Sequence, residues 1–133
     1  MQFGFDGNPD HPFLPHTYPA RCVAYTGTHD NDTTLGWFDS LDEEEKHRVR
    51  TYLSVSDDEV VRAMIQSLWE SDAALVVVPM QDLLELDSEH RMNIPGQAEG
   101  NWQWRMTAEE LENDEVYRWL GELTAAAGRV AGG

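Results

Sequence analysis

The sequence predicts an α/β protein built on parallel strands, and three observations support this prediction. Two short, largely apolar runs, Arg21–Thr28 and Ala74–Val78, are rich in residues that favour strands. Two helix-start patterns, beginning at Ser40 and Ser56, lie between these runs, and a third begins at Thr107. The order of strand, helices, strand, loop and helix is typical of a parallel α/β fold.

The first elements are expected to be a strand, a stiff loop and a second strand. Gln2–Phe5 has aromatic residues at alternate positions and predicts a small strand. The next segment contains Pro9, Pro12, Pro15 and Pro19, which exclude a regular helix. Arg21–Thr28 then predicts a strand. The run ALVVV at Ala74–Val78 is typical of a strand in a sheet that is covered on both faces.

Each helix-start pattern is a capping box, in which a Ser or Thr and a later Glu bond the free N–H groups of the first turn. The expected pairs are Ser40 with Glu43, Ser56 with Glu59 and Thr107 with Glu110. The helix after Ser56 is expected to carry one apolar face, made of Val60, Val61, Met64, Ile65, Leu68 and Trp69. The helical tail after Thr107 is expected to bury Leu111, Trp119, Leu120 and Leu123, and residues 128–133 to form a disordered tail.

These elements are too few for a closed parallel sheet. Two or three parallel strands leave open edges, and a barrel needs eight strands. Met1 also leads almost directly into a strand that has no upstream partner. We therefore expect the chain to be the C-terminal part of a larger protein, or to associate with another chain to complete its sheet.

The charge and the single cysteine limit the possible partners and compartment. The 25 acidic and 9 basic residues give a net charge of -16, which would repel phosphate backbones and anionic membranes. Cys22 alone can form neither an internal disulfide nor a thiolate zinc site, so we expect a reducing, cytoplasmic location. The N-terminus has no signal-peptide pattern, and no apolar run reaches the length of a membrane span.

A polar cluster follows the first long strand. In parallel α/β folds, functional groups gather where strands end, and Thr28–Asp32 occupies that place. For Asp32 and Thr33 we favour a structural role, as the cap of a short helix reaching Trp37. For His29 and Asp30 we favour a function over a turn-forming role, because adjacent polar side chains would stand at the mouth of the fold.

Two sequence blocks resemble the amylomaltases, which are 4-alpha-glucanotransferases or disproportionating enzymes. The blocks are YTGTHDNDTTLGW (Tyr25–Trp37) and RMNIPGQAEGNWQWR (Arg91–Arg105), and NPDHPFLPHTYP precedes the first. The resemblance covers nearly the whole chain. It implies the C-terminal part of a TIM (β/α)8 barrel of the alpha-amylase clan, glycoside hydrolase family 77. Such enzymes cut an alpha-1,4-glucosidic bond, hold the glucan covalently and pass it to a sugar 4-hydroxyl.

The resemblance also implies roles for individual residues. Asp30 matches the acid that grips sugar hydroxyls in the -1 subsite and stabilises the oxocarbenium-like transition state. His29 matches a histidine that hydrogen-bonds the same sugar. Asn93 is the candidate for substrate hydrogen bonding in the second block, since its amide both donates and accepts.

The remaining residues of the second block are less specific. Trp102 and Trp104 are candidates for stacking on glucose rings, and packing is the alternative role for both. Gln97 stands where the family resemblance implies Thr, and Arg105 is expected to be a structural ion-pair partner.

The motifs for the nucleophilic Asp and the acid/base Glu do not occur in this sequence. The isolated chain is therefore expected to transfer no glucan without the missing N-terminal part of the enzyme. The implied substrates are alpha-1,4-glucans such as maltose and maltodextrins, and no metal or organic cofactor is implied. Two alternatives stay open, which are a non-catalytic glucan-binding remnant and an acidic interaction module.

Overall fold

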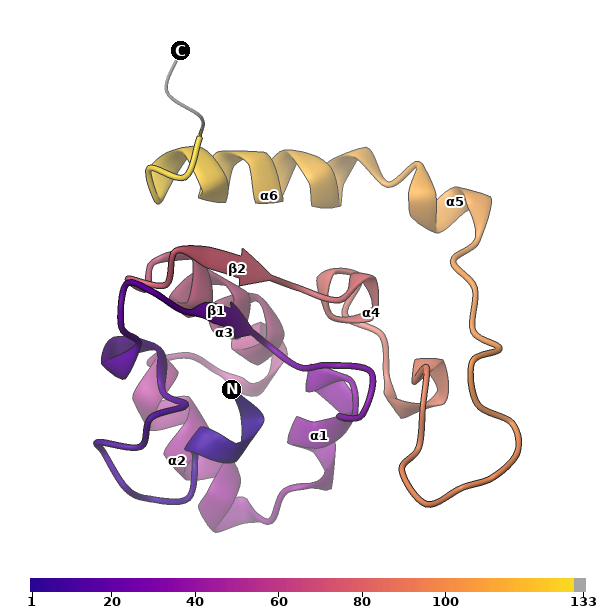
Figure 1. Cartoon of the computed structure of the whole chain (residues 1–133), viewed down its shortest axis with the longest axis horizontal. Helices are drawn as coiled ribbons and strands as arrows, with labels where there is room; N and C mark the ends of the chain where they lie inside the picture. Colours follow the sequence, from indigo (N-terminus) through magenta and orange to yellow (C-terminus); the bar gives the residue numbers. More distant parts are fainter. Residues whose placement is uncertain (131–133) are drawn as a thin grey trace.

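The structure, a computed structural model, describes residues 1–130. Its two strands, β1 (Val23–Tyr25) and β2 (Leu75–Val77), pair in parallel. Ala24 lies opposite Val76 in the register. The predicted parallel pairing is confirmed, although both strands are shorter than the apolar runs that predicted them. Figure 1 shows the two strands side by side.

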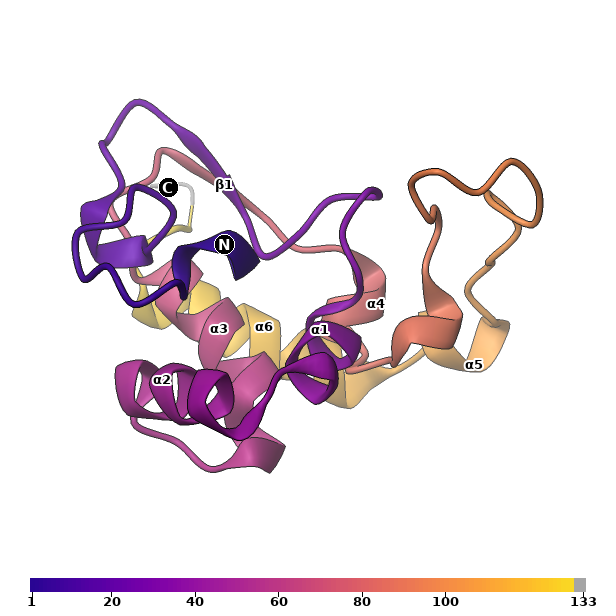
Figure 2. The ribbon, with the colours of Figure 1, turned by 90° about the horizontal axis from the view of Figure 1, so that it is seen from below.

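Helix α3 (Val60–Trp69) supplies most of the core, as its sequence predicted. All six apolar residues of its predicted face are buried. The chain enters α3 through the 3-10 turn η3 (Asp57–Glu59), which carries the expected capping box between Ser56 and Glu59. Packing of this face against Ala24 and the partly buried Val76 covers one side of the sheet. In Figure 2, α2 (Glu43–Leu53), α3 and α6 (Asp114–Ala126) lie on the same side of the strands.

The N-terminal segment differs from its prediction. Gln2–Gly4 forms a 3-10 turn, η1, and not a strand. The Gln2 side chain is buried and donates a 2.9 Å hydrogen bond from Nε2 to the backbone carbonyl oxygen of Asp32. Gly4 lies so close to Phe13 that an added Cβ would stand 3.0 Å from its backbone carbonyl. The aromatic alternation therefore does not reflect strand pairing: Phe5 packs against Trp37 and Tyr52, whereas Phe3 is exposed. A second turn, η2 (Pro15–Thr17), follows.

The capping box predicted at Ser40 is also wrong. Ser40 is the last residue of α1 (Thr34–Ser40), and its hydroxyl donates to the carbonyl oxygen of Trp37 at 2.7 Å. Helix α2 begins instead after Asp42, whose carboxylate accepts from the backbone N–H of Glu45 at 2.9 Å. Leu41 has an extended backbone, which ends α1 at Ser40 and leaves Asp42 to form the capping box of α2 with Glu45.

The C-terminal helical region is divided into two helices. The capping box at Thr107 is confirmed and opens the short helix α5 (Ala108–Leu111). A new N-cap at Asn113 then starts α6. Leu111, which we expected to be buried, is exposed because α5 stands apart from the core. The other expected residues, Trp119, Leu120 and Leu123, are partly buried against the α3 cluster.

The chain remains attached to the core after α6. The Arg129 guanidinium donates to the backbone carbonyl oxygens of Trp69, Ser71 and Ala73, at 2.6, 2.6 and 2.9 Å. Residues 128–130, which we expected to belong to a disordered tail, are part of the described structure, and Arg129 ties them to the core. Residues 131–133 lie outside the described part of the chain.

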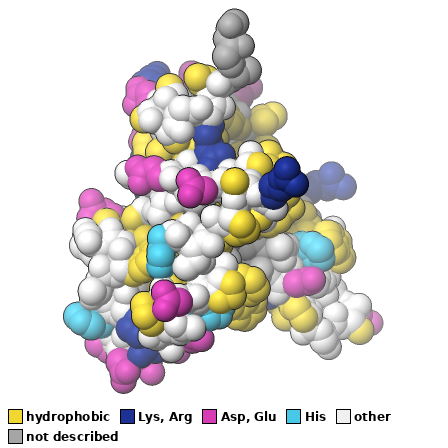
Figure 3. Space-filling model, turned by 60° about the vertical axis from the view of Figure 1, so that its left-hand side comes forward, with side chains coloured by type: hydrophobic (Ala, Val, Ile, Leu, Met, Phe, Trp, Pro, Cys, Tyr) yellow, Lys and Arg dark blue, Asp and Glu magenta, His cyan; other side chains and the backbone are white. Residues whose placement is uncertain are grey.

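One face of the sheet is open to solvent. Val23, Tyr25, Leu75 and Val77 point away from α3 and are 36% to 55% exposed. The expectation of a sheet covered on both faces is therefore not met within residues 1–130. Figure 3 shows apolar side chains at the surface between acidic ones. Within the same residues, no helix combines the length and apolarity that crossing a membrane requires.

Candidate functional site

The loop after β1 presents His29 and Asp30 to solvent. Asn31 accepts hydrogen bonds at its Oδ1 from the backbone N–H and the hydroxyl of Thr28, at 2.8 and 3.2 Å. The Asn31 N–H donates back to the carbonyl oxygen of Thr28 at 3.1 Å. This tight turn faces His29 and Asp30 outward, with side chains 53% and 59% exposed.

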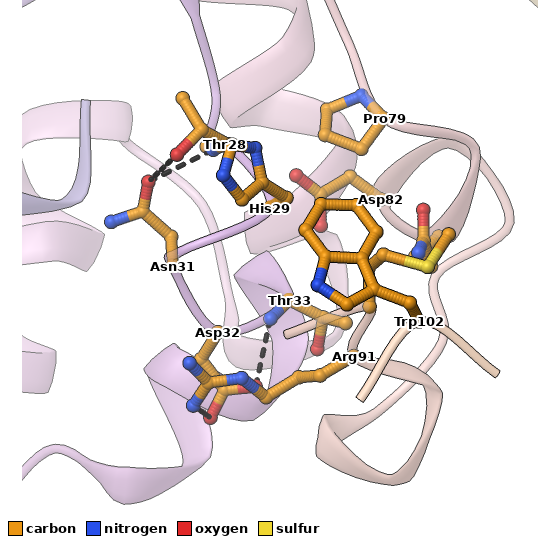
Figure 4. A pocket seen from close by; sticks show the side chains of 12 residues that line it. Thr28, His29, Asn31, Asp32, Thr33, Pro79, Asp82, Arg91 and Trp102 are labelled. Carbon is orange, nitrogen blue, oxygen red and sulfur yellow. Dashed lines mark hydrogen bonds and ion pairs between the residues drawn. The ribbon is translucent and has the colours of Figure 1, made fainter. Parts of the chain in front are cut away.

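A pocket of about 210 Å³ lies where both strands end (Figure 4). Its walls come from the loop after β1, from the start of α4 (Met80–Leu83) after β2, and from the segment after the 3-10 turn η4 (Ser88–His90). His29, Arg91 and Trp102 line it. Asp30 is not a lining residue, but it belongs to the same loop as His29.

The two sequence blocks meet at Asp30. The side-chain amide of Asn93 donates from Nδ2 to Asp30 Oδ1 at 2.8 Å. His29 Nε2 lies 3.3 Å from Asp30 Oδ2. The structure therefore brings together the three residues that the sequence placed in one sugar-binding site. An amide, an imidazole and a carboxylate in contact can together donate and accept hydrogen bonds with a polyhydroxyl ligand.

The second block forms a loop closed by its own hydrogen bonds. Trp102 N–H donates to the carbonyl oxygen of Met92 at 2.6 Å, and Ile94 N–H donates to Asn101 Oδ1 at 2.9 Å. The amide of Gln97 bonds within the loop, to the carbonyl oxygen of Glu99 at 2.8 Å. The chain leaves the pocket after Met92, and this closure brings Trp102 back to it.

Of the two candidate tryptophans, only Trp102 lines the pocket. Its ring centroid lies 5.1 Å from that of His29, with 44° between the ring planes. The Trp102 backbone adopts a φ of 63°, in the left-handed region that is uncommon for a large side chain. Trp104 is half-buried and is not among the lining residues. Arg105 is exposed and forms no ion pair within residues 1–130, contrary to expectation.

A buried carboxylate beneath the pocket was missed by the sequence interpretation. Asp82, on α4, is 2% exposed and accepts from the Thr26 hydroxyl at 2.6 Å. It also accepts from the backbone N–H and the hydroxyl of Thr34, at 2.7 and 2.8 Å. Burial raises the pKa of Asp82, and these hydrogen bonds offset part of that rise. One carboxylate thus holds both ends of the loop that carries His29 and Asp30.

Asp32 and Thr33 have separate roles. The Thr33 hydroxyl caps α1 by accepting from Gly36 N–H at 3.1 Å, which confirms one of the two expected cap residues. Asp32 is not the cap. Its carboxylate accepts from Thr33 N–H at 2.7 Å and from the Ser88 hydroxyl at 2.8 Å, and lies 3.8 Å from Arg91 Nη1.

The histidines outside this site make separate contacts. His11 lies 3.8 Å from Asp6, whereas the His16 ring bonds the hydroxyl of Tyr52 and the carbonyl oxygen of Pro9, both at 2.8 Å. Within the described part of the chain, no three His, Cys, Asp or Glu side chains are grouped as a metal site would require.

The sequence matches a known family over most of its length. The model of glycoside hydrolase family 77, described as 4-alpha-glucanotransferase, matches residues 1–111. This chain belongs to that family. The 4-alpha-glucanotransferase of Thermus thermophilus is 48% identical over 93% of this chain and 27% of its own length. The chloroplastic/amyloplastic 4-alpha-glucanotransferase of Arabidopsis thaliana is 42% identical over 98% of this chain and 23% of its own length.

A solved structure of the family is also similar. The amylomaltase from Streptococcus agalactiae, in complex with acarbose, superposes with a TM-score of 0.87 at 35% identity. That comparison covers 96% of this chain and 26% of the other. The chain therefore spans about a quarter of the length of these 4-alpha-glucanotransferases.

Proposed function

We propose that this chain supplies part of the donor-sugar site of a 4-alpha-glucanotransferase. The observation that carries the proposal is the exposed Asp30 carboxylate, which stands beyond the end of a parallel strand and contacts both His29 and Asn93. The proposed substrates are alpha-1,4-glucans such as maltose and maltodextrins. The acarbose bound to the similar amylomaltase supports this class of ligand.

In the proposed mechanism, Asp30 acts on the ring that becomes cationic. A retaining transfer passes twice through an oxocarbenium-like transition state, once to form the glycosyl-enzyme and once to release the glucan to an acceptor 4-hydroxyl. An ionised carboxylate can accept hydrogen bonds from two sugar hydroxyls, and its charge stabilises positive charge developing on the ring. His29 and Asn93 would orient the same sugar.

The nucleophile and the acid/base would come from a preceding part of the enzyme. We propose that β1 and β2 are neighbouring strands of a (β/α)8 barrel whose remaining strands lie in that part. The open sheet face, made of Val23, Tyr25, Leu75 and Val77, would then face the barrel interior. On this proposal the 133-residue chain alone transfers no glucan.

A graft tests the proposal. The matched quarter of the Thermus thermophilus enzyme is replaced by this chain, and conversion of maltotriose to glucose and longer oligomers is followed. We expect transfer by the graft and a loss of roughly 100-fold or more on Asp30→Asn, because Asn keeps the shape without the charge. Asp72→Asn is the matched control, since Asp72 is exposed before β2, at the opposite end of that strand.

Other outcomes point to other functions. A folded graft in which Asp30→Asn retains full transfer would contradict the role of Asp30. If the chain binds acarbose but its graft never turns over, it is a glucan-binding remnant. If it neither binds acarbose nor supports transfer, an acidic interaction module is the better description.

A further inference from the structure

The Arg91 guanidinium lies between the loops that carry Asp30 and Asn93. Its Nη2 donates to the backbone carbonyl oxygen of Asp30, and its Nε donates to that of Asn93, both at 3.3 Å. We propose that Arg91 is a positioning residue that sets the distance between Asp30 and Asn93. The inference rests on the proposed function, because its value lies in placing two sugar-binding side chains.

Arg91 is itself held by a third residue, Asp32. Its Nη1 lies 3.8 Å from the Asp32 carboxylate, and the two side chains are 19% and 22% exposed. Asp32 is fixed in turn by the Ser88 hydroxyl at 2.8 Å and, through its backbone carbonyl oxygen, by the buried Gln2 amide at 2.9 Å. A partly buried ion pair is screened less by salt than an exposed one. The guanidinium therefore has a defined anchor.

The chemistry of these contacts requires arginine. A planar guanidinium presents five N–H donors in fixed directions and can serve three acceptors at once. A lysine ammonium, a compact charge on a flexible stem, would not hold three separate acceptors in the same geometry. Because Arg91 bonds the backbone of Asp30 and Asn93, it leaves the carboxylate and the amide available to a ligand. Arg91 can therefore position Asp30 and Asn93 without using the hydrogen-bonding groups of their side chains.

The positive charge of Arg91 also offsets the negative charge of the carboxylates near the pocket. Asp32 and Asp82 line the pocket, and Asp30 lies on the same loop as Asp32 without lining the pocket. Among the described residues that line the pocket, Arg91 is the only Lys or Arg. Without it, the Asp32 carboxylate would lose the cation that lies 3.8 Å from it, in a pocket that Asp82 also lines, and like charges repel. Loss of Arg91 also removes its hydrogen bonds to the backbone of Asp30 and Asn93, and is therefore expected to loosen the contact between the two loops.

The test compares the 133-residue chain with its Arg91→Lys and Arg91→Ala variants. The NMR signals of the Asn93 side-chain amide report its hydrogen bond to Asp30. A titration with acarbose measures the affinity of the site. We expect the amide signals to shift and exchange faster in both variants, and acarbose affinity to fall by about tenfold, as for loss of one hydrogen bond to a charged group. Added methylguanidinium should partly restore both readouts in Arg91→Ala. Arg48→Lys, which alters an ion pair on α2, should change neither.

The outcomes separate this inference from the proposed function. Unchanged Asn93 signals and unchanged affinity in both folded variants would overturn the positioning role. So would loss of cooperative unfolding in both variants, since Arg91 would then be a structural residue. If wild type binds no acarbose while its Asn93 signals still respond to Arg91→Lys, the positioning role stands. The proposed function fails separately, if the folded graft transfers no glucan.

Discussion

The side-chain amide of Asn93 donates a 2.8 Å hydrogen bond to the carboxylate of Asp30, although 63 residues separate the two in the sequence. This contact joins the loop after β1 to the loop that follows η4. It explains how two blocks that are far apart in the sequence come to lie together in the fold. It also leaves Asp30 Oδ2 facing His29, so that the carboxylate has a defined direction while remaining exposed.

The buried carboxylate of Asp82 predicts a specific pH dependence. Its pKa in the folded chain is raised above the ordinary value of 3.8, mainly by burial. A carboxyl with a raised pKa stabilises the fold below its unfolded pKa, and this contribution is lost as pH rises through the folded pKa. Wild type should therefore lose stability relative to Asp82→Asn as pH rises from about 3.8. Urea unfolding of both proteins across that range measures the difference, and a constant difference would contradict the assignment.

Asp82→Ala should destabilise the chain more than Asp82→Asn. Alanine leaves the hydroxyls of Thr26 and Thr34 and the Thr34 N–H without their acceptor, at a cost of about 1–3 kcal/mol for an unsatisfied buried group. Asn keeps one oxygen acceptor at the same place. Equal free energies of unfolding for the two variants at pH 7 would argue that the hydrogen bonds of Asp82 do not hold the two ends of the loop.

Gly36 is required by the close approach of α1 and η4. A Cβ at this position would collide with the Ser88 hydroxyl and stand 2.9 Å from the Ser88 backbone nitrogen. Gly36→Ala should therefore lower the free energy of unfolding by about 1–3 kcal/mol, as overpacking does. Gly121→Ala is the control, because nothing lies within 4 Å of its Cβ position on α6. That change should stabilise the helix by roughly 0.5–1 kcal/mol, and similar effects at both sites would refute the packing argument.

Arg129 should contribute to stability through the carbonyl groups after α3. Arg129→Ala removes hydrogen bonds to the backbone oxygens of Trp69, Ser71 and Ala73, and we expect a loss of about 2–4 kcal/mol in chemical denaturation. Arg118→Ala, at an exposed position of α6, should change stability by less than about 0.5 kcal/mol. A negligible effect of Arg129→Ala would mean that these hydrogen bonds contribute little to stability in solution.

The two tryptophans of the second block should differ in glucan binding. Trp102→Ala should weaken acarbose binding by roughly 2- to 12-fold, since one aromatic contact contributes about 0.5–1.5 kcal/mol. Trp104→Ala should leave the affinity within about twofold, because Trp104 does not line the pocket. Calorimetric titration of both variants makes the comparison, and a larger loss at Trp104 would reverse the assignment.

The features that the sequence predicted correctly depend on local patterns. The buried face of α3 follows from the spacing of Val60 to Trp69, and the parallel strands follow from two apolar runs. Contacts between distant segments were not predictable in this way. Gln2 bonds the backbone of Asp32, thirty residues away, and Arg91 bonds the backbone of Asp30, at a separation of 61 residues.

The site itself was predicted only in part. His29, Asp30 and Asn93 were identified from two sequence blocks, and the structure brings them into contact. The role of Asp82 could not be predicted from its neighbours in the sequence, because a single Asp in a short helix usually lies on the surface. Its importance arises from burial, which depends on how α4 packs beneath the pocket.

A crystal structure of the graft with acarbose bound tests the central claim most directly. We predict that the Asp30 carboxylate accepts hydrogen bonds of about 2.5–3.0 Å from hydroxyl groups of the ring in the -1 position, with Asn93 and His29 contacting the same ring. Acarbose bound with no contact to Asp30, or an Asp30 side chain turned away from the ring, would contradict the account.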